Sequence, residues 1–149
     1  MTERILIVED EPDIRATLEY NLHRENYLTE SVGTILEAEK ILKETQISII
    51  LLDLMLPDGS GLDLCRKLKS EKESSAIPII ILTAKDDEVD KVVGFELGAD
   101  DYVTKPVKPK ILVSKVKALL RRLREEDKNQ EKLQLGKLII DREEYQVTF

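Results

Sequence analysis

The sequence predicts an α/β fold in which helices cover both faces of a doubly wound, five-stranded parallel sheet. The main evidence is that short apolar runs alternate five times with helical patterns. The run over 49–52 is unbroken, as expected for a strand that is buried on both faces of a parallel sheet. Polar residues follow these runs, and parallel strands end at one edge of such a sheet, where ligands bind. We therefore expect a functional site at that edge.

The apolar runs predict five strands, at residues 4–8, 28–32, 49–52, 78–84 and 101–104. The first, third and fourth are rich in β-branched residues and leucine and carry polar chemistry only where they end. The second is weaker, and the fifth is short and edge-like. Right-handed crossovers are expected between them.

Capping signals and apolar spacing predict a helix after each strand. Pro12 opens the first helix, and Thr34 begins a capping-box pattern at the second. The third follows the glycine-rich turn that ends at Gly61. The fourth, at 86–97, has acids in its first turn and a glycine after its last residue. Pro109 opens the fifth helix.

The chain is predicted to hold one domain at 1–124 and the beginning of another. Residues 125–131 are nearly all polar and are interpreted as a linker. Residues 132–149 carry short apolar runs around a glycine and a charged turn, which predicts antiparallel strands. These strands are too few to bury a core by themselves.

Composition argues against several classes of protein. Among the 149 residues, acids outnumber bases by 30 to 23, so the formal net charge is −7 and a nucleic-acid-coating role is disfavoured. A single cysteine excludes an internal disulfide, and with one histidine it builds no metal motif. No stretch has the pattern of a signal peptide or a membrane span, so we expect a cytoplasmic protein without membrane contact.

Charged and hydroxyl side chains gather at the predicted strand ends. Glu9 and Asp10 follow the first strand, Asp53 the third, Thr83 ends the fourth, and Lys105 follows the fifth. Three carboxylates at one edge repel each other, and a hard divalent cation such as Mg²⁺ relieves the repulsion. The cation and the lysine would neutralise phosphate oxygens while Asp53 attacks phosphorus, which gives an aspartyl phosphate.

Five motifs together resemble the receiver domain of two-component response regulators. They are Glu9-Asp10, LLDLMLPDGSG around Asp53, Thr83-Ala84, GADDY at 98–102, and Lys105-Pro106. The resemblance covers about the first four-fifths of the chain. The remaining residues are similar to the start of the winged-helix DNA-binding domain of the OmpR/PhoB subfamily.

The resemblance implies a flavodoxin-like fold with strand order 2-1-3-4-5. It implies that Asp53 accepts a phosphoryl group from a sensor histidine kinase. It also implies that Glu9, Asp10, Asp53 and the backbone carbonyl of Met55 hold Mg²⁺.

The resemblance further implies a conformational switch. Lys105 would pair with the phosphoryl group, and the Lys105–Pro106 peptide bond would be cis. The Thr83 hydroxyl would move to the phosphoryl group while Tyr102 turns inward, and Ala84 is small enough to leave the site open.

In this subfamily the switch favours a symmetric dimer through the fourth helix, fifth strand and fifth helix. The residues at the matching positions are Lys91, Glu96, Asp100, Asp101, Ile111, Lys115, Lys117 and Arg122. Ile111 stands where the family usually has a glutamate, so Lys91 loses its expected partner. Promoter DNA is an expected partner only if a complete effector domain is present.

Two alternative functions stay open. Phosphatases of the haloacid dehalogenase type also attack with an aspartate beside Mg²⁺, but they need a second aspartate two residues later. Met55 stands there and cannot donate a proton, so we do not expect an enzyme. A scaffold that is never phosphorylated would have a broken acid pocket, and this one is intact. Because Met55 cannot orient a water molecule either, slow self-dephosphorylation is expected.

Overall fold

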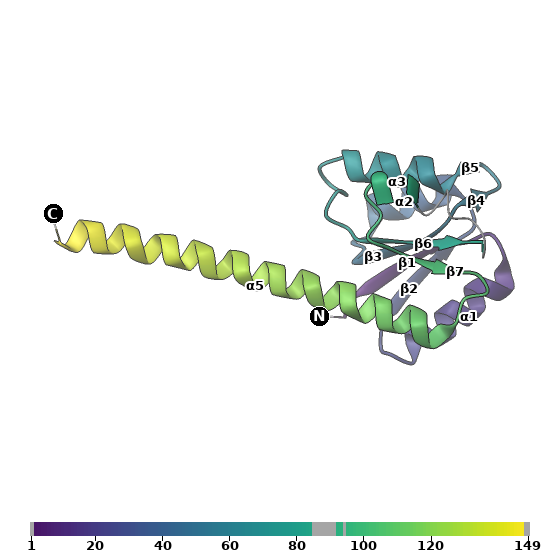
Figure 1. Ribbon diagram of the computed structural model, residues 1–149, viewed down its shortest axis with the longest axis horizontal. Helices are drawn as coiled ribbons and strands as arrows, with labels where there is room; N and C mark the ends of the chain where they lie inside the picture. Colours follow the sequence, from purple (N-terminus) through teal and green to yellow (C-terminus); the bar gives the residue numbers. More distant parts are fainter. Residues whose placement is uncertain (1, 85–91, 94, 148–149) are drawn as a thin grey trace. The chain divides into compact units, whose positions relative to one another are not determined.

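The computed structural model describes residues 2–84, 92–93 and 95–147 (Figure 1). Its main sheet has five parallel strands in the order β2-β1-β3-β6-β7. Their bounds are β1 Arg4–Val8, β2 Leu28–Val32, β3 Ile49–Asp53, β6 Ile79–Thr83 and β7 Asp101–Thr104. Counted along the chain, this is the order 2-1-3-4-5, so the predicted fold class is confirmed.

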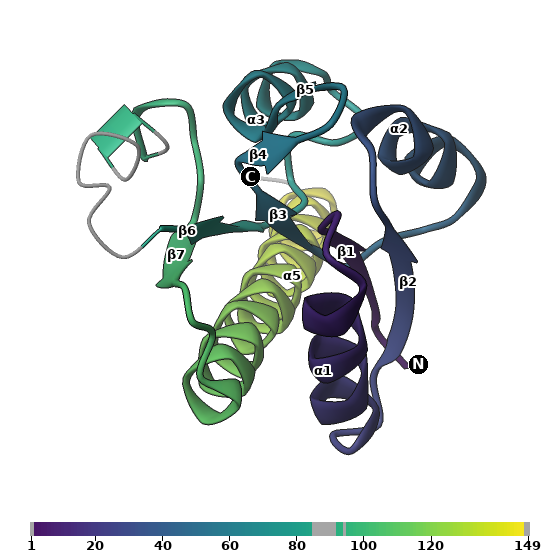
Figure 2. The same ribbon diagram turned by 90° about the vertical axis from the view of Figure 1, so that its right-hand side faces the viewer.

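The central strands are buried because both of their faces are covered. Every residue of β3 and β6 is buried, and so are the last four residues of β1. Figure 2 shows α2 (Ile35–Glu44) and α3 (Gly61–Ser70) on one face of the sheet, with α1 (Pro12–His23) on the other. Alternate residues of each strand therefore enter different cores, which explains why the apolar runs do not alternate with polar residues.

The helices begin where the sequence predicts them. Pro12 is the first residue of α1, and the Thr34 hydroxyl caps α2 by accepting a hydrogen bond from the Glu37 amide at 3.1 Å. The Ser60 hydroxyl accepts from the Leu62 amide at 3.2 Å and caps α3.

A small antiparallel hairpin follows β3 and was not among the predicted elements. Its strands are β4 (Met55–Leu56) and β5 (Gly59–Ser60). The hairpin brings the chain back toward the Asp53 backbone, and α3 begins there at Gly61.

The structure has a helix where the sequence predicts a linker at 125–131 and strands at 132–149, because α5 (Pro109–Val147) continues through residues 125–147. Residues 148–149 lie outside the described residues. The reason is that glutamate, lysine, arginine, glutamine and leucine dominate this segment and favour helix. A two-stranded hairpin without further strands or a packed helix is only marginally stable. The strand prediction is therefore wrong for this structure, and the domain boundary after residue 124 stays a prediction. Residues 117–149 form a compact unit of their own.

The predicted fourth helix lies partly outside the described residues. Residues 92–93 and 95–96 are helical, while 85–91 and 94 are not described, and Lys91 is among these. No helix in the described ranges combines the length and apolar character that crossing a bilayer requires.

Candidate functional site

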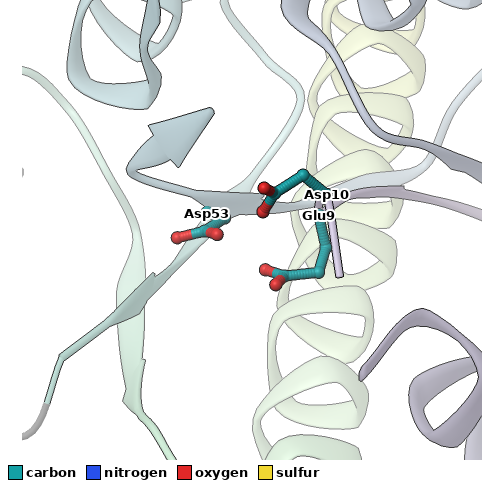
Figure 3. Close-up of side chains that lie close together, drawn as sticks. All are labelled: Glu9, Asp10 and Asp53. Carbon is teal, nitrogen blue, oxygen red and sulfur yellow. The ribbon is translucent and has the colours of Figure 1, made fainter. Parts of the chain in front are cut away.

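The carboxylates of Glu9, Asp10 and Asp53 gather at the carboxyl end of the sheet (Figure 3). One carboxylate oxygen from each lies within 4.8 Å of the others. The strand register explains this proximity, because Val8 of β1 lies beside Leu52 of β3. Glu9 and Asp53, each one residue further along, thus reach the same level. The predicted acid cluster is confirmed.

The cluster is unusual because two of its carboxylates are removed from water. Glu9 is fully buried and Asp53 is 6% exposed, whereas Asp10 is exposed. Burial of the Glu9 carboxylate, its hydrogen bond with Asp53 and the charge of Asp53 raise the pKa of Glu9 to about 7. Lys105 opposes this shift but does not cancel it. The site therefore carries more negative charge than its own residues neutralise.

Lys105 supplies the positive charge that the buried acids require. Its Nζ lies 3.1 Å from Asp53 Oδ2 and 3.2 Å from each oxygen of Glu9. Burial alone would lower the pKa of Lys105, but hydrogen bonds with Asp53 and Glu9 and their charges outweigh it and raise that pKa. The Lys105–Pro106 peptide bond is cis, as the resemblance implies.

Two buried oxygens in the site find no hydrogen-bond partner among the described residues. They are Glu9 Oε2, which meets Lys105 only as an ion pair, and Thr83 Oγ1, on a residue that is 1% exposed. Leaving such atoms unpaired is costly, so they favour a bound group that satisfies them. A set of carboxylate oxygens is what Mg²⁺ prefers, and the residues present therefore fit this ion.

Asp53 is held on its other side by the chain that follows it. Its Oδ1 accepts a hydrogen bond from the Met55 amide at 3.3 Å, while the Met55 side chain is 83% exposed. The Gly61 amide donates to the Leu54 carbonyl at 2.8 Å. A Cβ added to Gly61 would lie 2.2 Å from the Asp53 carbonyl oxygen, so only glycine allows α3 to start this close.

The two residues of the predicted switch lie on neighbouring strands. Thr83 ends β6, and Tyr102 is a half-buried residue of β7 beside Ile81. The Tyr102 ring meets Phe95 edge-on at a centroid distance of 5.5 Å, and Lys115 Nζ lies 5.3 Å from the same ring. Ala84 is exposed at the end of β6.

Several predicted dimer residues make contacts within the chain. Asp101 forms an ion pair with Lys115 at 2.9 Å, and Asp100 Oδ2 accepts from Lys69 Nζ at 3.1 Å and from the Ile79 amide at 2.8 Å. Glu96 is exposed, and Ile111 is 46% exposed. Lys117 and Arg122 belong to the second unit of the chain. Each of them takes part in at least one interaction. The dimer itself stays a prediction.

Sequence reasoning missed the contacts of two polar residues, one at the site and one in the hairpin that follows Asp53. Arg15 Nη1 of α1 donates to the Glu9 carbonyl at 3.1 Å. Asp58, in the turn between β4 and β5, accepts from the Ile35 and Leu36 amides at 2.9 and 3.0 Å and so caps α2 from a distant part of the chain. These hydrogen bonds lower the pKa of Asp58. Neither contact has a signal in the spacing of the sequence, since both join separate elements.

Comparison with known proteins agrees with this geometry. A sequence model described as the response regulator receiver domain matches residues 5–117. The chain is 45% identical over 148 residues to the DNA-binding response regulator MtrA of Mycolicibacterium smegmatis. The aligned region covers 99% of this chain and 63% of MtrA. It is 46% identical over 118 residues to the transcriptional regulatory protein GltR of Pseudomonas aeruginosa, covering 79% of this chain and 49% of GltR.

Among solved structures, the receiver domain of the TMAO respiratory system response regulator TorR superposes with a TM-score of 0.76 at 42% identity. The match covers 80% of this chain and 98% of the TorR chain. The chain spans between about half and two thirds of the length of the two curated relatives.

Gly61→Ala is predicted to destabilise the chain by about 1–3 kcal/mol, because the new methyl group meets the Asp53 backbone and not a side chain that can rotate away. Urea unfolding followed by circular dichroism measures this. Arg66→Ala, at an exposed position of the same helix, is the control and should stay within about 0.5 kcal/mol of wild type. Equal stability of the two variants would contradict the prediction.

Proposed function

Because the chain belongs to the response regulator receiver domain family, we propose that it receives a phosphoryl group on Asp53 in a two-component phosphorelay. The observation that carries the proposal is the position of the Asp53 carboxylate. It lies at the end of a central strand, with Lys105 Nζ on one oxygen and the Met55 amide on the other. The donor is proposed to be a phosphohistidine of a sensor kinase.

In the proposed transfer, a carboxylate oxygen of Asp53 forms a bond to phosphorus while the bond from phosphorus to the donor nitrogen breaks. The donor imidazole leaves with the electron pair of that bond. Lys105 stabilises the added negative charge, since its Nζ is already 3.1 Å from Asp53 Oδ2. The residues orient the reacting groups and supply charge. No side chain of the site has to donate or accept a proton in this step.

The proposed ligands of Mg²⁺ are Glu9, Asp10, Asp53 and the backbone carbonyl of Met55. The support is the acid cluster, the unpaired buried Glu9 oxygen and the excess negative charge. When bound, the ion would neutralise negative charge on the phosphoryl oxygens and on the carboxylates. Ala84 is proposed to leave the space beside Asp53 open for the phosphoryl group.

Thr83 and Tyr102 are the proposed switch. The buried Thr83 hydroxyl has no partner among the described residues, so a phosphoryl oxygen would give it one. Tyr102 is half-buried on the adjacent strand and would turn inward as Thr83 moves. Its present neighbours, Phe95 and Lys115, would then rearrange on the face proposed for dimerisation.

Dimerisation through that face is proposed to be the output of the switch. An intermolecular contact of Asp101 or Lys115 would have to replace the ion pair that joins them within the chain. Ile111 contributes exposed apolar surface where the family usually has a charge. Relatives named as DNA-binding and transcriptional regulators support control of promoter DNA, which requires a complete effector domain.

Incubation with Mg²⁺ and acetyl phosphate is predicted to add one phosphoryl group to wild type and none to Asp53→Asn, as read by intact mass. The asparagine amide is not a nucleophile toward phosphorus, whereas the carboxylate is. Asp58→Asn is the matched control, since Asp58 is an acid of the same loop that faces α2, and it should keep the adduct. An adduct on Asp53→Asn would refute the assignment.

Asp10→Ala is predicted to abolish stabilisation by Mg²⁺. A ligand at a hundred times its dissociation constant stabilises the folded chain by about 2.7 kcal/mol, which a thermal unfolding scan of wild type detects. Asp10 is exposed, so its removal leaves the core intact. Asp13→Ala, a nearby exposed acid on α1, should respond to Mg²⁺ like wild type. A full Mg²⁺ response in Asp10→Ala would remove Asp10 from the ligand set.

Met55→Asn is predicted to shorten the half-life of the phosphorylated chain several-fold. The Met55 side chain is exposed beside Asp53 and cannot hydrogen-bond to a water molecule, whereas an asparagine amide can orient one for attack. Intact mass over time after removal of the donor gives the half-life. Met55→Leu is the control and should not shorten it; an unchanged or longer half-life in Met55→Asn would show that the prediction is wrong.

A further inference from the structure

Arg15 reaches the acid cluster from outside the proposed set of Mg²⁺ and phosphoryl ligands. It lies in the second turn of α1, and its Nη1 donates to the backbone carbonyl of Glu9 at 3.1 Å. This carbonyl belongs to the peptide group that joins Glu9 to Asp10. Arg15 thus holds the one backbone unit that both acids share.

The preceding peptide group, which joins Val8 to Glu9, is held by the neighbouring strand β2. The Glu9 amide donates to the Val32 carbonyl of β2 at 3.0 Å. With the Arg15 contact, both polar groups of the Glu9 backbone are engaged, one by β2 and one by α1. A hydrogen bond from a charged donor is stronger than one between neutral groups, so the Arg15 contact is the firmer of the two.

Gly33 makes room for the Arg15 guanidinium. A Cβ added to Gly33 would lie 2.8 Å from Arg15 Nη1, but 3.7 Å from Asp10 Cα and 3.9 Å from the Glu9 carbonyl oxygen. The last two are ordinary contact distances, and Gly33 does not have the left-handed φ that would demand glycine. The side chain of Arg15 is therefore what a methyl group at position 33 would displace.

We propose that Arg15 is a positioning residue for the Mg²⁺ ligands Glu9 and Asp10, and that Gly33 is required because it leaves space for the Arg15 guanidinium. The inference rests on the proposed function, since it concerns the ion of the same site. Rotation of the Glu9–Asp10 peptide group would change the direction of both carboxylates at once. Partners that orient metal ligands typically contribute ten- to a hundredfold in metal affinity.

The test measures the Mg²⁺ dissociation constant by calorimetric titration of wild type, Arg15→Met and Gly33→Ala. We expect each variant to bind about tenfold more weakly than wild type, because each removes the hydrogen bond to the Glu9 carbonyl. Gly33→Ala keeps the positive charge of Arg15, so its effect separates position from charge. Arg15→Lys should bind Mg²⁺ about as weakly as Arg15→Met, since lysine lacks the planar guanidinium group that lies beside Gly33.

A double-mutant comparison shows whether the two residues act together. In an Arg15→Ala background there is no guanidinium to displace, so Gly33→Ala should change the dissociation constant less than twofold further. Arg4→Met is the matched control: Arg4 is also half-buried and binds Glu30 Oε1 at 2.9 Å, away from the acids. It should keep the Mg²⁺ affinity of wild type even if its unfolding temperature falls.

Two results would overturn the inference. One is a dissociation constant within twofold of wild type in both Arg15→Met and Gly33→Ala, and the other is a full Gly33→Ala effect without Arg15. If wild type itself binds no Mg²⁺, the proposed function fails, and hydrogen exchange of the metal-free chain decides the inference. Faster exchange of the Glu9 and Asp10 amides in Arg15→Met, but not in Arg4→Met, would support it, and equal exchange would refute it.

Discussion

The contact of one lysine with two buried carboxylates is the constraint on which the rest of the structure depends. Burying Glu9 and Asp53 is costly unless a positive group meets them, and Lys105 is the group that does so. The three residues come from the ends of β1, β3 and β7, so their contact ties distant parts of the chain into one edge of the sheet. Strand register has to be correct for them to meet, since a slip of one residue would turn an acid into the core.

The apolar strands give this edge its rigidity. All of β3 and β6 is buried, so the backbone that carries Asp53 and Thr83 has little freedom to move. The loops beyond the strands are held by specific contacts: the start of α3 lies against the Asp53 carbonyl because residue 61 is glycine. This rigidity suits a site that orients a reacting carboxylate, because a small displacement of such a group lowers the reaction rate strongly.

The sequence patterns were sufficient to predict the sheet and the acid cluster, because each depends on local patterns and on the general rule that parallel strands end together. The strand order was predicted only from the resemblance to the receiver family. The sequence was not sufficient for the contacts of Arg15 and Asp58, because each joins one element to another: Arg15 of α1 contacts the Glu9 carbonyl after β1, and Asp58 contacts the first amides of α2. It was misleading for residues 132–147, where apolar runs around Gly136 favour strands but the helix-forming residues between them prevail.

Two buried oxygens at the site, Glu9 Oε2 and Thr83 Oγ1, have no hydrogen-bond partner among the described residues. The Thr83 hydroxyl is buried without a partner among the described residues, while Lys105 is shared between two acids. A phosphoryl group on Asp53 would add negative charge and oxygens at the point where both side chains converge. The Lys105 amide also donates to the Thr83 carbonyl at 2.7 Å, so the two residues move on linked backbone. The site is therefore joined through the backbone to β7, which carries the half-buried Tyr102 and the Asp101 of the Asp101–Lys115 ion pair.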